Sequence, residues 1–221
     1  MNYLFLSGTE LFYGIIKDEI RTVLSCLQSS EKKYKNKDII YRAGTHMKEI
    51  GLIEEGSVNI VEYDSWGNKS ILGNIKKGDI FGLPYAAIPG KKLQGDVVAN
   101  ENCTILFLNL ENLITICPKS CPFHNKIIHN LFRILAKKTL NSHQRMKHIS
   151  EKTIRSKLIS YLSEQAFEYG KPNFTIVFNR QQLSEYLGVD RSALSNELSK
   201  MQKDGLIVYE KNTFTLLSKL K

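Results

Sequence analysis

The hydrophobic residues nearest the N-terminus recur at steps of three and four positions, which is the period of one face of an α-helix. Gly14 interrupts this series, and glycine lowers helix propensity. The pattern therefore predicts a helical cap over residues 9–27, with Gly14 as the place for a break. Its apolar positions are Leu11, Phe12, Ile15, Ile16, Ile20, Val23, Leu24 and Leu27.

From about residue 32 to residue 110 the pattern changes to short runs of β-branched and aromatic residues. Many short strands with closely spaced turn signals are typical of an antiparallel roll or barrel. We therefore expect an antiparallel β-roll after the helical cap. The runs are 38–41, 51–53, 58–61, 70–72, 97–99 and 104–108, and Gly44, Gly56, Gly67, Gly73, Gly78 and Gly82 stand between them.

The segment after the β region contains two prolines that separate two expected helices. Asn109 can cap a short helix that reaches Ile116, and the prolines at 118 and 122 end one element and start the next. A long helix is therefore predicted to begin near Phe123.

The first half of this long helix is apolar over more than half of its circumference, which is more than one covering sheet requires. A helix from a second subunit would account for the excess. The predicted dimer interface consists of Ile127, Ile128, Leu131, Ile134 and Leu135. The second half, residues 137–147, is basic, and we expect it to be solvated or to face DNA.

Residues 150–217 contain alternating helix and strand patterns. Ser150 is a good N-cap for a helix that ends at Gly170, and Phe174, Ile176 and Phe178 alternate as in a strand. Two helices then follow, over 180–187 and from Asp190 to about residue 203. The last runs, 206–209 and 214–217, predict a two-stranded hairpin.

Residues 180–198 (RQQLSEYLGVDRSALSNEL) meet the physical requirements of a helix-turn-helix. Gly188 permits the turn, and the small residues Ser184 and Ala193 allow the helices to approach closely. Asp190 caps a second helix whose exposed first turns carry side chains that can reach phosphates and base edges in a major groove. Those side chains are Arg191, Ser192, Ser195 and Asn196, while Leu183, Leu187, Val189, Leu194 and Leu198 fill the angle between the helices. An ordinary helical hairpin is the alternative.

Composition limits the class of protein. With 221 residues and 42% hydrophobic residues, the chain can form a sensing domain and a small second module. The net charge of +9 suggests a polyanionic partner, either nucleic acid or an anionic membrane surface, although a solvated basic surface is the simpler alternative. We find no signal peptide and no apolar stretch of about 18 residues, so we expect a soluble, cytoplasmic protein without a membrane partner. The four cysteines are too few and scattered for a disulfide framework.

With these parts in place, the chain resembles the Crp/Fnr family of bacterial transcription regulators over nearly its whole length. The strongest match is residues 189–195 (VDRSALS) with 198–207 (LSKMQKDGLI), which look like the family's recognition helix and wing entry. The glycine turns 41–44 (YRAG), 53–58 (IEEGSV) and 78–82 (GDIFG) are similar to turns of the family's roll.

The resemblance implies an α+β fold with an N-terminal antiparallel β-roll, a long central dimerisation helix and a C-terminal winged helix-turn-helix. The implied domains are a sensor over 1–122, the dimerisation helix over 123–149 and a DNA-binding domain over 150–221. A two-fold homodimer would read palindromic duplex DNA under the control of a small-molecule effector, and RNA polymerase is the expected protein partner. The predicted DNA-binding residues are Arg180, Asp190, Arg191, Ser192, Ser195, Asn196, Lys200 and Lys211.

The sensor departs from the family's cyclic-nucleotide pattern. Members that bind cyclic nucleotides carry a ribose-binding glutamate after the Phe-Gly turn and a phosphate-binding arginine before a later strand. Here Gly82 is followed by Leu83 and Pro84, and Lys91 and Lys92 could replace the arginine only in part. We therefore do not expect cyclic AMP as the effector.

The segment 117–124 (CPKSCPFH) is the remaining candidate for an effector or redox site. Cys121 is predicted at a helix start, where the helix dipole favours a thiolate. Cys117 and Cys121 would then form a thiol pair, or a metal or haem site with His124, but two thiols and one imidazole leave the usual four-ligand site incomplete. Two buried structural cysteines are the simpler alternative, so we expect no metal and no cofactor. An iron-sulfur cluster would need more cysteines near the N-terminus than Cys26.

Two other classes of function were considered. An enzyme is disfavoured, because no phosphate-binding loop, nucleophile elbow or zinc-hydrolase motif occurs and His46 is the only histidine in the expected roll. An effector-binding regulatory protein that does not bind DNA remains the alternative.

Overall fold

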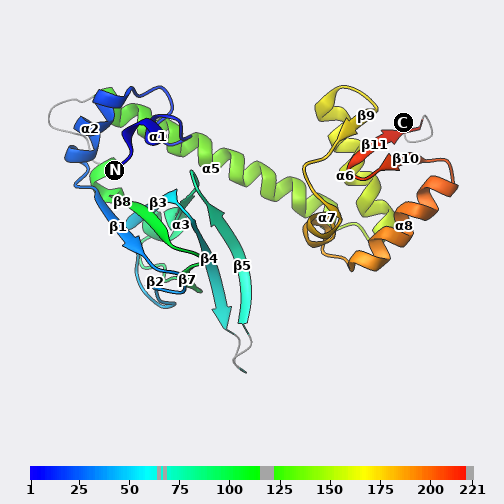
Figure 1. The fold of residues 1–221 in the computed structure, drawn as a ribbon, viewed down its shortest axis with the longest axis horizontal. Coiled ribbons are helices and arrows are strands. Elements are labelled where there is room, and N and C mark those ends of the chain that lie inside the picture. The colour runs from blue at the N-terminus through cyan, green and yellow to red at the C-terminus, as the bar shows by residue number, and fades with distance from the viewer. Residues whose placement is uncertain (64–65, 67–68, 115–121, 218–221) are drawn as a thin grey trace. The chain divides into compact units, whose positions relative to one another are not determined.

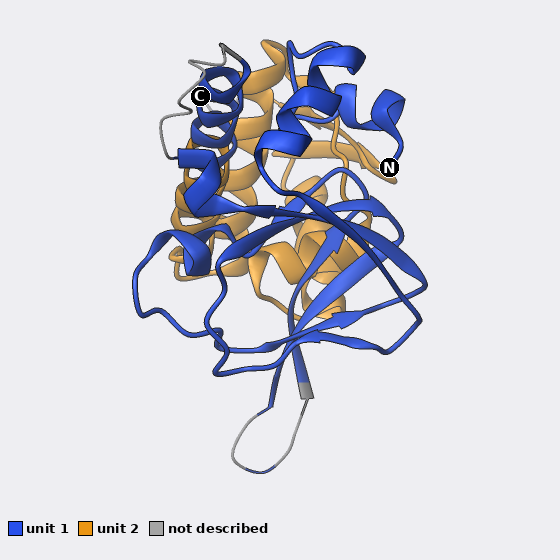
Figure 2. Ribbon diagram, turned by 90° about the vertical axis from the view of Figure 1, so that its left-hand side faces the viewer, with its two compact units in different colours: residues 1–135 blue, residues 136–221 orange. Residues whose placement is uncertain are grey.

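The computed structural model describes residues 1–63, 66, 69–114 and 122–217 (Figure 1). The chain divides into two compact units, Met1–Leu135 and Ala136–Lys221 (Figure 2). The division falls within a single long helix. Among the described helices, none is long and apolar enough to cross a lipid bilayer.

The N-terminal segment forms two helices, α1 (Tyr3–Ser7) and α2 (Lys17–Cys26), rather than one helix from residue 9. The prediction was wrong at its start, because residues 9–14 are turns and Gly14 adopts a left-handed φ of +75°. The α2 helix begins after Ile16, whose amide donates to the Glu19 carboxylate at 3.0 Å. The buried apolar side chains of this cap are packed in one core with residues of the roll and the long helix.

The roll consists of two four-stranded antiparallel sheets. The prediction of an antiparallel roll is confirmed. One sheet has the order β1 (Ser30–Tyr34), β8 (Cys103–Asn109), β3 (Glu49–Glu55) and β6 (Ile80–Phe81). The other has the order β2 (Ile39–Tyr41), β7 (Asp96–Ala99), β4 (Ser57–Tyr63) and β5 (Lys69–Lys76).

Aromatic rings fill the interior of the roll. Phe107 on β8 is 1% exposed, and the rings of Tyr34, Tyr41 and Phe81 meet it edge-on with centroids 6.1–6.4 Å away. Phe81 also lies over Gly51, where an added Cβ would come within 2.3 Å of the ring. The close approach explains why glycine occupies this buried strand position, and it leaves the roll interior occupied by the chain's own side chains.

Three helices accompany the roll: α3 (Leu83–Ala87), α4 (Leu110–Ile114) and α5 (Pro122–Ile149). The end predicted for α4 at Ile116 lies outside the described residues. The long helix α5 is the central helix predicted from the sequence. Its buried Asn130 side chain donates to the backbone oxygens of Leu11 at 3.0 Å and Tyr13 at 2.9 Å. These bonds attach the turn between α1 and α2 to α5.

The second unit is a winged helix-turn-helix, as predicted. It contains α6 (Ile154–Tyr169), β9 (Asn173–Thr175), α7 (Arg180–Leu187), α8 (Arg191–Lys203), β10 (Ile207–Glu210) and β11 (Thr213–Leu216). The three strands form an antiparallel sheet in the order β10-β11-β9. The predicted cap at Ser150 was wrong: Thr153 caps α6 by accepting from the Ser156 amide at 3.0 Å, while Ser150 donates to the Lys147 oxygen.

Candidate DNA interface and effector region

The recognition helix α8 begins at a well-formed cap. The Asp190 carboxylate accepts hydrogen bonds from the Ser192 hydroxyl at 2.5 Å and from the Ala193 amide at 2.9 Å. These bonds, led by that from Ser192, lower the pKa of Asp190 below its ordinary value. A carboxylate held at the positive end of the helix dipole stabilises the first turn of α8.

The two faces of α8 differ in exposure. Leu194, Leu198 and Met201 are fully buried against the rest of the unit. Arg191, Asn196 and Lys200 are exposed. The Arg191 guanidinium has no hydrogen-bond or ion-pair partner among the described residues, so it is available to a ligand outside the chain.

The other predicted contacts on α8 are engaged locally. The Ser195 hydroxyl donates to the Arg191 oxygen at 3.0 Å, and Ser192 donates to Asp190. Both hydroxyls can exchange these bonds for an acceptor on DNA, because a hydroxyl rotates freely and also accepts. Asp190 is explained as a helix cap, which corrects its assignment as a DNA contact.

Arg180 is committed to the wing. Its guanidinium donates to the Lys211 oxygen at 2.9 Å and lies 4.8 Å from the Tyr209 ring centroid and 5.3 Å from that of Phe214. Burial lowers the pKa of Arg180. The structure therefore places Arg180 as an anchor between α7 and the wing turn, which corrects its assignment as a free phosphate contact. Lys211 itself is exposed at that turn, with a φ of +50°.

The C-terminal end of α7 is held by two basic side chains that the sequence did not single out for this role. Arg145 on α5 donates to the oxygens of Tyr186 at 3.0 Å and Glu185 at 3.2 Å. Lys157 on α6 donates to the Leu187 oxygen at 3.2 Å. Cations at a helix C-terminus satisfy its free carbonyl groups. The basic end of α5 thus serves the helix-turn-helix internally, and basic composition alone could not distinguish this from a DNA-facing role.

The predicted effector residues surround α3. Gly82 has a left-handed φ of +82°, and an added Cβ would lie 2.4 Å from Met47 Cε. Leu83 is buried, whereas Lys91 is exposed at the edge of an apolar groove of about 740 Å³ between α3, α4 and α5. Lys92 pairs with His46 through an isolated β-bridge. Cys117 and Cys121 lie outside the described residues.

The predicted dimer face divides into two sets. Ile127, Leu131 and Ile134 are buried in the chain's own core and are not available to a partner, which corrects their assignment to the interface. Ile128 and Leu135 are 37% and 39% exposed. Phe132, which was omitted from the predicted interface, is 72% exposed. Three- and four-residue spacing alone does not tell which of two adjacent apolar stripes faces the chain's own roll.

Comparison with known protein families agrees with this arrangement of roll, long helix and winged helix. The family model of the cyclic nucleotide-binding domain matches residues 31–120, and that of the Crp-like helix-turn-helix domain matches residues 156–220. The chain belongs to the Crp/Fnr family. It is a DNA-binding transcription regulator of the Crp/Fnr type.

Known Crp/Fnr proteins resemble the chain in sequence and in fold. The regulatory protein HlyX of Actinobacillus pleuropneumoniae is 24% identical over 88% of this chain and 81% of its own length. Electron transport regulator A of Shewanella oneidensis is 23% identical over 76% of this chain and 67% of its own length.

Two solved structures share the Crp/Fnr fold at lower identity. The catabolite activator protein of Thermus thermophilus is 20% identical, with a TM-score of 0.53 over 95% of this chain and 94% of its own. CprK complexed with OCPA is 12% identical, with a TM-score of 0.61 over 90% of this chain and 91% of its own.

Proposed function

We propose that this regulator reads palindromic duplex DNA as a homodimer, with α8 entering the major groove. The observation that carries the proposal is the exposed, unengaged Arg191 one residue after the Asp190 cap, on a helix whose opposite face is fully buried. An arginine at the start of a recognition helix can donate two hydrogen bonds to one guanine. Ser192, Ser195 and Asn196 are proposed as further base contacts, and Lys200 and Lys211 as phosphate contacts.

We propose that the dimer forms along an exposed seam of α5. The seam follows alternating steps of four and three residues, which is the heptad spacing of a two-stranded coiled coil. It lies beside the stripe that packs on the chain's own core. Its members, all of them exposed, are Ile128, Phe132, Leu135, Thr139, Ser142 and Met146.

The proposed division of labour follows the predicted domains: residues 1–122 sense the effector, 123–149 hold the dimer together and 150–221 bind DNA. RNA polymerase is proposed as the protein partner and the cytoplasm as the location. The chain is proposed to have no catalytic activity, in keeping with relatives that are regulatory proteins. A regulator that binds an effector but no DNA is the second candidate, and a gel shift with DNA from upstream of the protein's own gene distinguishes the two.

The effector is proposed not to be cyclic AMP. Two observations support this: the residues expected to hold ribose and phosphate are missing after Gly82, and Phe107 and its aromatic neighbours fill the roll interior. We expect isothermal titration of cyclic AMP into the purified protein to show no binding in the micromolar range. A micromolar dissociation constant accompanied by tighter DNA binding would contradict the proposal.

The role of Arg191 is tested by replacing it with alanine. We expect Arg191→Ala to lose about 1–3 kcal/mol of binding free energy on the cognate site and to relax the preference at one base pair of each half-site. The matched variant is Lys200→Ala, which removes one cation from the same exposed helix face. Lys200→Ala should weaken cognate and scrambled duplexes alike and reduce the salt slope by about one per contact.

Both variants are measured by fluorescence anisotropy on cognate and scrambled duplexes over a range of salt concentrations. If Arg191→Ala weakened both duplexes equally, Arg191 would be a phosphate contact, and sequence reading would rest on Ser192, Ser195 and Asn196. Unchanged binding of both duplexes would remove α8 from the interface.

A further inference from the structure

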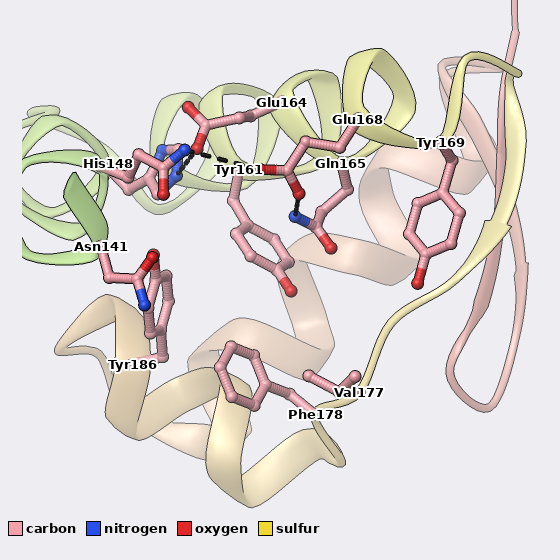
Figure 3. Close-up of a pocket in the computed structure, with 11 residues that line it drawn as sticks. Asn141, His148, Tyr161, Glu164, Gln165, Glu168, Tyr169, Val177, Phe178 and Tyr186 are labelled. Atoms are coloured by element: carbon pink, nitrogen blue, oxygen red, sulfur yellow. Dashed lines mark hydrogen bonds and ion pairs between the residues drawn. The ribbon is translucent and has the colours of Figure 1, made fainter. Parts of the chain in front are cut away.

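A second cavity lies within the Ala136–Lys221 unit, on the side of α6 that meets α5 and α7. Its volume is about 430 Å³, the size of a small-molecule site. Aromatic side chains form much of its wall: Tyr161 and Tyr169 from α6, Phe178 from the segment before α7, and Tyr186 from α7 (Figure 3). The same figure shows Glu168 and Gln165 above the space between Tyr161 and Tyr169.

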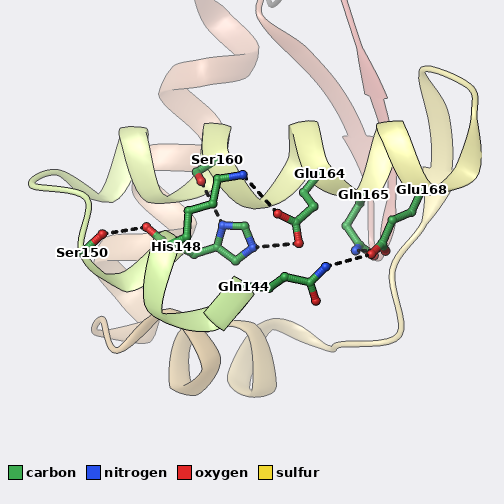
Figure 4. A network of polar contacts seen from close by, with 8 residues as sticks. Gln144, His148, Ser150, Ser160, Glu164, Gln165 and Glu168 are labelled. Atoms are coloured by element: carbon green, nitrogen blue, oxygen red, sulfur yellow. Dashed lines mark hydrogen bonds and ion pairs between the residues drawn. The ribbon is translucent and has the colours of Figure 1, made fainter. Parts of the chain in front are cut away.

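The charged groups of this cavity are acidic, in a chain whose net charge is +9. Glu164 is balanced by Lys147, whose Nζ lies 3.3 Å from Glu164 Oε2. Glu168 is different, because it accepts hydrogen bonds only from the neutral amides of Gln165 at 2.8 Å and Gln144 at 3.5 Å (Figure 4). Within the part of the chain that the structure describes, no lysine or arginine forms a salt bridge with Glu168.

The remaining polar wall residues do not supply the missing cation. His148 is 1% exposed, with Nδ1 2.9 Å from Ser160 Oγ and Nε2 3.6 Å from Glu164 Oε1. Burial lowers the pKa of His148 from its ordinary 6.5, against the opposing effect of Glu164, so the imidazole is neutral at pH 7. Burial, with the nearby Tyr186 and Glu168, raises the pKa of Tyr161, which therefore stays an uncharged phenol.

Arg145 is the nearest arginine, and its position limits where a ligand can bind. Its guanidinium carbon lies 5.7 Å from the centre of the Tyr186 ring, and its nitrogens are bonded to the end of α7. That cation occupies the Tyr186 side of the cavity. The side formed by Glu168, Tyr161 and Tyr169 combines a carboxylate without a cationic partner and aromatic rings.

We propose that this cavity binds an organic cation: a protonated amine with a small apolar or aromatic body. The ammonium group would pair with Glu168, and the body would lie among Tyr161, Tyr169 and Phe178. A carboxylate beside aromatic faces is the chemistry that selects such cations, because the ring faces are electron-rich and the apolar body leaves water. The site does not depend on DNA binding or on the effector of the roll.

Isothermal titration calorimetry on the full chain tests this with two matched probes, benzylamine and benzyl alcohol, which share a ring but differ in charge. We expect benzylamine to bind one site per chain with a dissociation constant of about 1 mM or tighter. Benzyl alcohol should bind at least about tenfold more weakly, because it lacks the ammonium group.

Two variants locate the site. Glu168→Gln keeps the shape of the side chain and removes its charge, and should weaken benzylamine about tenfold. Glu151→Gln removes an exposed carboxylate of the same unit outside the cavity and should leave the affinity unchanged. Thermal unfolding of both variants establishes that they fold like the parent chain. No binding of benzylamine at about 10 mM, equal affinity for the alcohol, or an unaffected Glu168→Gln variant would each overturn the proposal.

Discussion

Replacement of Phe107 by alanine is expected to lower the free energy of unfolding of the roll by about 3–5 kcal/mol. Phe107 is 1% exposed, and Tyr34, Tyr41 and Phe81 surround its ring. Removing the ring leaves a cavity that these three aromatic side chains cannot fill without leaving their strands. The loss therefore includes both the transfer free energy of the ring and the cost of the cavity.

Chemical denaturation followed by circular dichroism measures this loss. The control is Tyr13→Ala, which removes an aromatic ring that is 68% exposed in the same unit and should change the stability by no more than about 0.5 kcal/mol. A loss below about 1 kcal/mol for Phe107→Ala would show that the roll interior is not closely packed. That result would also reopen the roll as an effector cavity.

Phe132→Asp is expected to convert the dimer into monomers and to weaken binding to a palindromic site by on the order of 100-fold. Phe132 is the most exposed apolar side chain on the proposed α5 seam, at 72% exposure. Two aspartates facing each other in a dimer would be unpaired charges buried at the interface. A monomer would hold one half-site and lose the contribution of the second recognition helix.

Light scattering gives the mass of each variant, and anisotropy gives its affinity for DNA. The matched control is His129→Asp, which introduces the same acid at an exposed position of α5 off the seam and should leave a dimer. Leu131→Asp is unsuitable, because Leu131 is buried in the chain's own core and its replacement would test folding. An intact Phe132→Asp dimer would place the interface elsewhere.

Local sequence signals predicted the winged helix-turn-helix closely, because each boundary is set by residues near it. Asp190 caps α8, and Gly188 ends α7 in the left-handed conformation at a φ of +62°. Strands β1 and β6 were missed for opposite reasons. The β1 sequence SEKKY is dominated by charged and polar residues, and β6 has only two residues. Both are strands because β8 and β3 pair with them, which is a tertiary effect.

The candidate site was predicted less completely, because the sequence gives the type of a residue but not its partners. Arg180 and Arg191 look alike in the sequence, yet Arg180 packs on Tyr209 and Phe214 while Arg191 is exposed. Likewise, nothing near His148 in the sequence indicated a companion, whereas the fold brings Ser160 and Glu164 to its two ring nitrogens. Such long-range contacts decide which polar groups remain available.

The central claim, that two α8 helices of a dimer read duplex DNA, is tested most directly by selecting binding sites from a random duplex pool with the purified full chain. The account predicts that the enriched duplexes share an inverted repeat whose half-site centres lie about one helical turn, roughly 34 Å, apart. The Arg191→Ala variant should enrich repeats with a relaxed preference at one position of each half-site. A selected pool indistinguishable from the starting pool at physiological salt would contradict the claim.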